Sequence, residues 1–148
     1  MSALLLTSGL ASSANIELEL TTHVGEQRFF NQGDRLHFLL NINQDAFLYI
    51  YYLDAKKQLH KLIPTQSLSP LFVHSGWFIP VPGQDFELVV SPPFGKEKIF
   101  VLALSGMITD TQDREFESEE KLIDFYREAA LSNQLDFGVV SKEIVTQR

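Results

Sequence analysis

The sequence contains no cysteine among its 148 residues, which excludes disulfide bonds, thiol catalysis and zinc sites built from thiolates. It also lacks an apolar run of about 18 residues and therefore predicts no transmembrane segment. Positive charge is scarce, because 12 Lys and Arg stand against 19 Asp and Glu, for a net charge of −7. A chain this acidic is a poor candidate for binding nucleic acid or an anionic membrane surface.

Motifs that carry chemistry are missing as well. There is no Gly-x-Ser-x-Gly elbow, no P-loop and no Gly-x-Gly-x-x-Gly turn. No two of the four histidines have the i, i+4 spacing of metal ligands on one helix face; they are His23, His37, His60 and His74. The sequence therefore predicts no catalytic residue, no metal site and no cofactor, and it favours a protein that is not an enzyme.

What the chain does have is a length typical of one domain and many aromatic residues, with twelve Phe and four Tyr. Aromatic residues favour strands. Short apolar or alternating segments recur every 8–14 residues or so, with turn residues between them. This spacing predicts an antiparallel β-sandwich, with strands near residues 16–21, 36–42, 47–53, 59–63, 78–82, 85–91, 97–105 and 136–146.

The hydrophobic pattern of the sequence changes after residue 106, where apolar residues recur at helical spacing. Acidic residues crowd the start of this segment and Arg127 lies late in it, as the helix dipole favours. We expect one α-helix over about 118–132, packed on a sheet. The fold class is thus mainly β with one C-terminal helix, and residues 15–148 are expected to form a single domain.

The strand predicted at 47–53 is apolar on both faces. Tyr49 and Tyr51 share one face with Phe47, while Leu48 and Ile50 lie on the other. A strand of this kind is covered on both sides, on one of them by the opposing sheet. Two covers are open for the tyrosine face: the late helix, or a ligand or partner that binds an aromatic surface. In the second case Tyr49 and Tyr51 are binding residues.

The segment 77–82 reads as an edge strand, because Pro80 and Pro82 cannot donate to a sheet ladder. Trp77 and Phe78 precede the prolines and should point to opposite faces, one buried and one at the rim. The exposed one is a candidate contact for a partner, since aromatic residues anchor interfaces. The alternative is that Trp77 simply covers the end of the core.

Residues 1–14 have a short apolar patch followed by small residues, which resembles the tail of a signal peptide. No Lys or Arg precedes the patch, so a leader of another kind is the alternative. On the first interpretation the protein is periplasmic or associated with the cell envelope, and on the second it is cytoplasmic.

Several turns and strands resemble one family. Gly33 and Asp34 open a strand, a tyrosine-rich strand leads into an aspartate turn at 49–54, and Pro64 ends the next strand. A Pro-x-Gly turn at 93–97 precedes another apolar strand. Over about residues 16–105 this order is similar to the bacterial domain-of-unknown-function family four-three-eight-four. The chain departs from that family at the hairpin turn, where Lys56 and Lys57 stand in place of a favoured glycine.

The resemblance implies an accessory module, because such domains occur in envelope proteins and beside protein kinases and caspase-like peptidases. It brings no catalytic residues. We therefore expect a non-enzymatic module of a bacterial envelope or secretion assembly that binds a protein or peptide. The alternative is a small hydrolase or carbohydrate-binding domain whose site gathers loop carboxylates and tyrosines. A cleft in which His, Asp and Tyr converge would favour the alternative.

Overall fold

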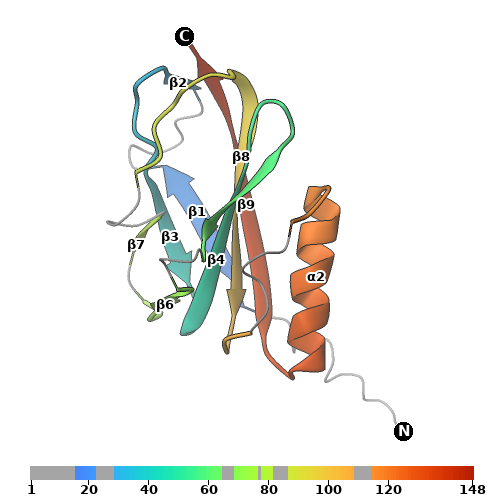
Figure 1. Ribbon diagram of the computed structural model, residues 1–148. Helices are drawn as coiled ribbons and strands as arrows, with labels where there is room; N and C mark the ends of the chain where they lie inside the picture. The colour runs from blue at the N-terminus through green and yellow to red at the C-terminus, as the bar shows by residue number, and fades with distance from the viewer. Residues whose placement is uncertain (1–15, 23–28, 65–68, 77, 82–86, 109–114) are drawn as a thin grey trace, which may run out of the picture.

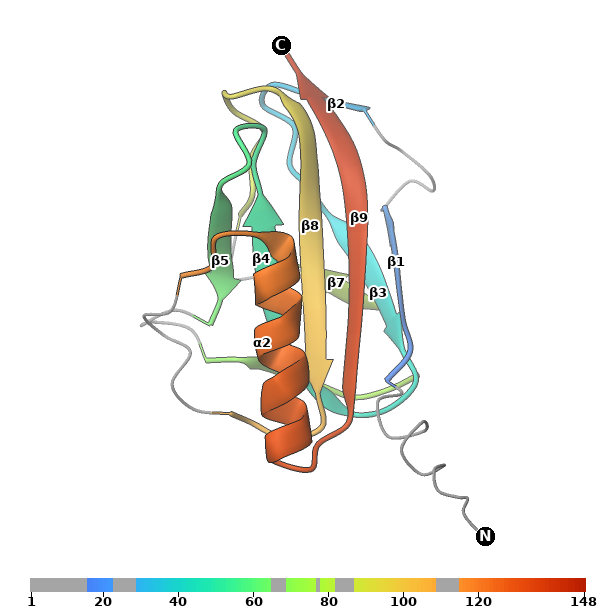
Figure 2. The same ribbon diagram turned by 90° about the vertical axis from the view of Figure 1, so that its right-hand side faces the viewer.

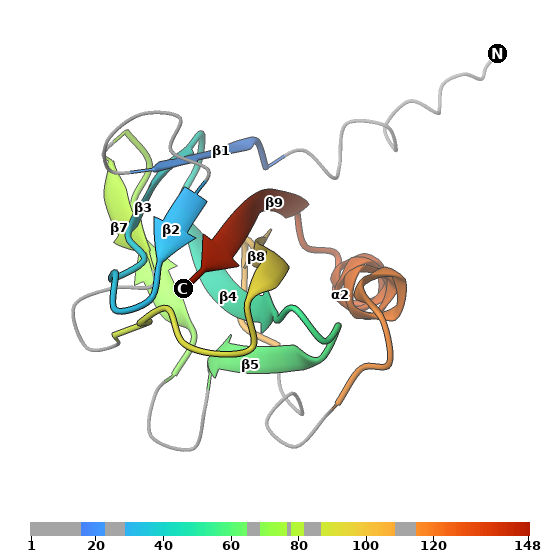
Figure 3. The ribbon, with the colours of Figure 1, turned by 90° about the horizontal axis from the view of Figure 1, so that it is seen from above.

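The computed structural model describes residues 16–22, 29–64, 69–76, 78–81, 87–108 and 115–148. Two β-sheets and one helix form three layers (Figures 1 and 3). Figure 3 shows helix α2 (Glu119–Ser132) on one side of strands β4 and β8, with β3 and β7 on the other side. The predicted mainly-β fold with one C-terminal helix is confirmed. Residues 1–14, predicted to be a leader, lie outside the described part of the chain.

The smaller sheet has three antiparallel strands in the order β1 (Leu18–Thr22), β3 (Phe38–Ile42) and β7 (Ile79–Val81). In β3 the alternate residues Phe38, Leu40 and Ile42 are buried. Strand β7 is the last strand of this sheet, and its exposed Pro80 lies opposite Leu39. The sequence prediction of a proline-bearing edge is thus confirmed at Pro80, whereas Pro82 lies outside the described residues.

The larger sheet has six strands. Its order is β2 (Phe29–Asn31), β9 (Phe137–Gln147), β8 (Gly95–Leu104), β4 (Ala46–Leu53) and β5 (Leu59–Ile63), and β6 (Leu71–Val73) also pairs with β4. All pairs are antiparallel except β2 with β9, which is parallel. A parallel pair needs a long connection, and here most of the domain lies between the two strands.

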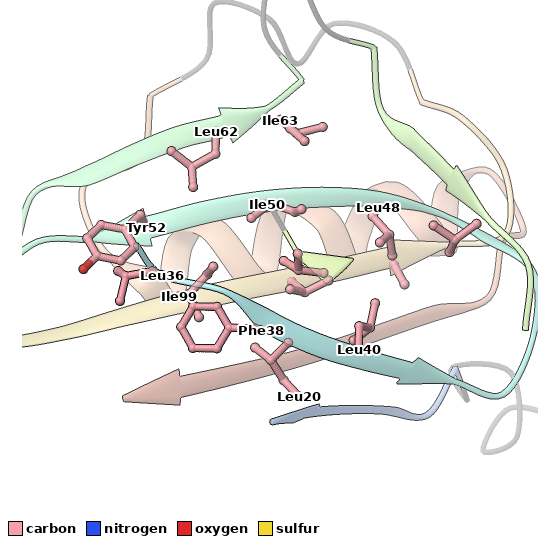
Figure 4. Packing of buried hydrophobic residues seen from close by; sticks show 14 of the residues in the cluster. Leu20, Leu36, Phe38, Leu40, Leu48, Ile50, Tyr52, Leu62, Ile63 and Ile99 are labelled. Carbon is pink, nitrogen blue, oxygen red and sulfur yellow. The ribbon is translucent and has the colours of Figure 1, made fainter. Parts of the chain in front are cut away.

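Strand β4 divides the core into two parts. Leu48, Ile50 and Tyr52 face the smaller sheet and pack in the core between the sheets, which Figure 4 shows. Tyr49 and Tyr51 face the other way and are fully buried with residues of α2. The prediction that this strand is covered on both faces is confirmed, and the helix supplies the second cover.

Helix α2 begins where the sequence predicts. Ser118 is its N-cap, and the Ser118 side chain accepts a hydrogen bond of 3.2 Å from the backbone N–H of Lys121. The buried stripe of the helix consists of Leu122, Tyr126 and Ala130, at i, i+4 and i+8. Figure 2 shows this helix lying over β8 and β4. Within the described ranges, no helix has the length and apolarity needed to cross a bilayer.

One local prediction is wrong, and one strand is irregular. Of the strand expected at 85–91, the structure describes residues 87–91 and shows only one isolated bridge, between Arg35 and Val89. In β5 the side chains do not alternate strictly between the two faces, because a bulge shifts its register against Ile50 and Tyr51. As a result Leu62 and Ile63, which are neighbours in sequence, both pack in the core between the sheets.

Candidate functional site

The sandwich is joined along one side and open along the other. On the joined side, the backbone N–H of Ile16 donates to the carbonyl oxygen of Phe137 at 3.2 Å, so β1 meets β9. On the open side, β5 is the outermost strand of the larger sheet and faces the segment 88–93. A cleft of about 400 Å³ lies between them.

Most of the wall of this cleft is apolar, with a few polar groups converging on it. Figure 4 shows Tyr52, Leu36 and Leu62 together at one end of the core. The apolar lining comprises Leu36, Leu62, Leu88, Val89, Val90, Pro92 and Pro93, and the polar lining comprises Tyr52, Asp54, His60, Ser91 and Glu97. A concave apolar site with few polar groups is the usual form of a binding pocket.

Hydrogen bonds to the chain before β3 hold the 88–93 wall in place. The N–H of Leu36 donates to the carbonyl of Leu88 at 2.8 Å, and the N–H of Val90 donates to the carbonyl of Asp34 at 2.8 Å. This pairing buries Leu36 and Val90 and leaves Val89 44% exposed at the rim. The single bridge at Val89 is therefore what shapes this wall.

Glu97 is a buried carboxylate in the cleft wall, only 5% exposed. The Tyr52 hydroxyl donates to its Oε1, and the Thr146 hydroxyl donates to its Oε2 at 2.6 Å. Burial raises the pKa of the Tyr52 phenol well above its usual range, and the hydrogen bond and charge of Glu97 raise it further. The phenol is therefore a permanent donor at neutral pH, held against the carboxylate.

Asp54 and His60 lie at the hairpin end of the cleft. Asp54 accepts hydrogen bonds from the N–H of Lys56 at 2.9 Å, the N–H of Gln58 at 3.0 Å and His60 Nε2 at 2.8 Å. Burial raises the pKa of the Asp54 carboxyl, but these hydrogen bonds outweigh it and bring the pKa below its ordinary value. The carboxylate therefore closes the turn between β4 and β5.

The same turn explains the departure from the family pattern at Lys56 and Lys57. Lys57 has φ of 67°, in the left-handed region where glycine is normally favoured. The strain of a side chain in this region is of order 1 kcal/mol. The three hydrogen bonds to Asp54 and the bond from the N–H of Lys57 to the Asp54 carbonyl, 2.9 Å, offset it.

The cleft does gather Tyr, Asp and His, the combination that would favour chemistry. Its two acids, however, are engaged by partners within the chain. Among the described residues, no hydrogen bond joins Ser91 to His60, so no nucleophile and base form a pair. No group of three or more potential metal ligands occurs in the described ranges either. The arrangement is suited to holding a ligand by shape and hydrogen bonding.

This site was not identified from the sequence, although the alternation of residues along β8 indicates that Glu97 faces inward. Glu97 has the same parity as Ile99 and Val101, both of which face the core between the sheets. Tyr52 pairs with Ile99 across the sheet, so Tyr52 and Glu97 are diagonal neighbours on that face. The alternation along β8 is therefore sufficient to predict that the Glu97 side chain faces the core between the sheets.

Three of the four binding residues predicted from the sequence are described, and they lie outside the cleft lining. Tyr49 and Tyr51 are 0% and 2% exposed beneath α2, so they form no surface, and the idea of an open tyrosine face is corrected. Phe78 is 68% exposed beside edge strand β7, as expected of a rim residue. Trp77 lies outside the described residues. Tyr49, Tyr51 and Phe78 are thus all absent from the cleft lining.

The described surface also carries an exposed aromatic side chain and a second hollow. Near Phe78 in the chain, Phe72 is 46% exposed and its ring lies 5.0 Å from that of Phe47. A hollow of about 390 Å³ at the start of α2 is lined by Glu115, Phe116, Glu117, Lys121, Asp124, Phe125 and Glu128. Ion pairs at its rim already join Lys121 to Glu117 at 3.5 Å and Arg127 to Asp124 at 3.3 Å.

Comparison with known proteins adds a family but no activity. The sequence profile of a family described as "Domain of unknown function (DUF4384)" matches residues 29–105, about half of the chain. The match begins later than the resemblance from residue 16 indicated and leaves out β1, α2 and β9. The described residues that line the cleft all fall within it. No curated protein and no solved structure matches the chain.

Proposed function

Because the chain belongs to the DUF4384 family, whose members share a domain of unknown function, we propose that it is a non-enzymatic module that binds a protein or peptide partner. The observation that carries the proposal is the open cleft between β5 and the segment 88–93. It lies beside β5, the outermost strand of the larger sheet, where an extended peptide can enter. Its walls are mostly apolar, with a few polar groups converging on it.

The proposal extends to the setting of the protein. The resemblance implies an accessory role in a bacterial cell-envelope or secretion assembly, with the protein in the periplasm or at the envelope. A module in such an assembly needs a partner surface rather than a reaction centre. Cell fractionation tests this placement. We expect the full chain to be recovered with the envelope or periplasm.

A carbohydrate-binding domain or small hydrolase is the second candidate. It is favoured by the convergence of Tyr52, Asp54 and His60 on the cleft. It ranks second because Asp54 closes the hairpin turn and, among the described residues, no hydrogen bond joins Ser91 to His60 as a nucleophile and its base. Binding on a glycan array, or turnover of ester or glycoside substrates that is lost in His60→Ala, would reverse the order.

Photo-crosslinking tests the first candidate directly. A benzophenone amino acid is placed at Val89, on the rim of the cleft, in the full chain produced in its native host. The matched control carries it at Leu131, which is 64% exposed on α2 and outside the cleft lining. We expect one defined peptide adduct from position 89 and none of the same identity from position 131. Absence of any adduct specific to position 89 would contradict the proposal.

A further inference from the structure

Glu97 has no cationic partner among the described residues. It is buried at 5% exposure, and both of its hydrogen-bond partners, Tyr52 and Thr146, are neutral hydroxyls. None of the ion pairs among the described residues includes it. Buried carboxylates are as a rule paired with a cation, so one whose hydrogen-bond partners are hydroxyls alone is unusual.

The position of the carboxylate shows where a counter-charge can come from. Glu97 lines the cleft, and each carboxylate oxygen can accept a second hydrogen bond beyond the one it has. Asp54 adds negative charge at the hairpin end of the same cleft. Arg35, from the neighbouring segment, is paired with Glu87 at 3.2 Å on an exposed surface.

The walls indicate what kind of cation fits. Leu36, Leu62 and Val90 offer apolar surface, and a volume of about 400 Å³ exceeds that of a small inorganic ion. A long aliphatic stem ending in a positive charge matches both features, because lysine and arginine bury their stems along apolar surface. A bare metal ion would leave the apolar walls without contact.

We propose that the cleft receives a lysine or arginine side chain of the partner peptide, with Glu97 as its counter-charge. This inference rests on the proposed binding function and adds the chemistry of the partner. The hydroxyls of Tyr52 and Thr146 hold the carboxylate in position for a charge-assisted hydrogen bond. The overall charge of −7 also favours the approach of a cationic segment.

The test is an NMR titration of the full chain with three capped amino acids: the N-acetyl N′-methylamides of lysine, arginine and norleucine. Norleucine has a similar stem without the charge. We expect the lysine and arginine probes to shift the amide signals of residues 59–63 and 88–93. Norleucine should bind the same residues at least about tenfold more weakly, as expected when the charge-assisted contact is lost.

Two variants with the same change in net charge show whether Glu97 is responsible. Glu97→Gln should remove the preference for the cationic probes. Glu143→Gln, on the exposed face of β9 and outside the cleft, should keep it. Circular dichroism shows whether each variant is folded. If Glu97→Gln does not fold, the preference of the wild-type chain for lysine over norleucine decides the question.

Equal binding of norleucine and lysine in the cleft would overturn the cation inference while leaving peptide binding by the cleft in place. Shifts confined to residues near Phe116 and Phe125 would also overturn it, since the probe would then occupy the hollow at α2. No shift at the cleft with any probe counts against it too. Failure of the proposed function is detected separately, by the crosslinking experiment at Val89.

Discussion

The hydroxyl oxygens of Tyr51 and Tyr126 lie 2.7 Å apart, and this buried hydrogen bond joins strand β4 to helix α2. The two rings also meet edge to face, with centroids 5.9 Å apart. Burial raises the pKa of the Tyr51 phenol to about 12, so it is protonated at neutral pH. The pair therefore fixes the helix against the sheet by a neutral hydrogen bond within an apolar layer.

Tyr126→Phe should destabilise the protein by about 1–3 kcal/mol, because the hydroxyl of Tyr51 loses its buried partner. Tyr51→Phe should cost a similar amount. The double variant should cost clearly less than the sum, since no unpaired hydroxyl remains. Urea unfolding of the four proteins measures this. Strictly additive losses would show that the hydroxyls do not depend on one another.

Leu122→Ala should cost about 2–5 kcal/mol, because Leu122 is fully buried between α2 and the larger sheet. Leu131→Ala is the matched control in the same helix, where the side chain is 64% exposed, and should change stability by less than about 0.5 kcal/mol. Similar losses in both variants, measured by denaturant unfolding, would mean that α2 does not pack on the sheet as described.

Gly138→Ala should detach β1 from β9. A Cβ at position 138 would lie 2.1 Å from the carbonyl oxygen of Ile16, a backbone atom that cannot move aside alone. We expect a loss of about 1–3 kcal/mol, as for overpacked sites, together with faster amide hydrogen exchange in β1. Gly106→Ala is the control, since its Cβ would meet only the flexible side chain of Leu135. Unchanged exchange in β1 would contradict this packing.

Asp54→Asn should destabilise the protein at neutral pH but not in acid. The folded-state pKa of Asp54 lies below 3.8, the unfolded value. Ionised Asp54 therefore stabilises the fold fully above about pH 5, and this contribution is lost as pH falls through the folded-state pKa. Stability measured from pH 7 to pH 3 should show the wild-type and variant curves converging in acid. A constant difference would assign the effect to shape rather than charge.

Much of the fold was predictable because local patterns and tertiary packing agree. The alternation of β4 placed Tyr49 and Tyr51 on one face and Leu48 and Ile50 on the other, and the structure keeps both faces. The helix was predicted at its true position, since Ser118 and the acids after it are a typical N-terminus. Pro80 likewise marked an edge strand, because proline cannot donate to a ladder.

The cleft was less predictable because it depends on contacts between distant segments. The wall at 88–93 is fixed by hydrogen bonds to residues 34–36, and no local pattern encodes that pairing. The bulge in β5 changes the side on which Ile63 lies, which alternation alone cannot reveal. The parallel pair of β2 and β9 also joins segments that are far apart in the sequence, so no local pattern predicts it.

The most direct test of the account is the affinity of the peptide crosslinked at position 89, measured by calorimetry for four proteins. These are the wild type, Ser91→Trp, Leu131→Trp and Phe78→Ala. Ser91 is an exposed residue in the cleft lining, so an indole there should obstruct entry. We predict at least about tenfold weaker binding for Ser91→Trp and less than about twofold change for the other two variants. Unchanged affinity in Ser91→Trp with loss in Phe78→Ala would contradict the account and place the binding surface at edge strand β7.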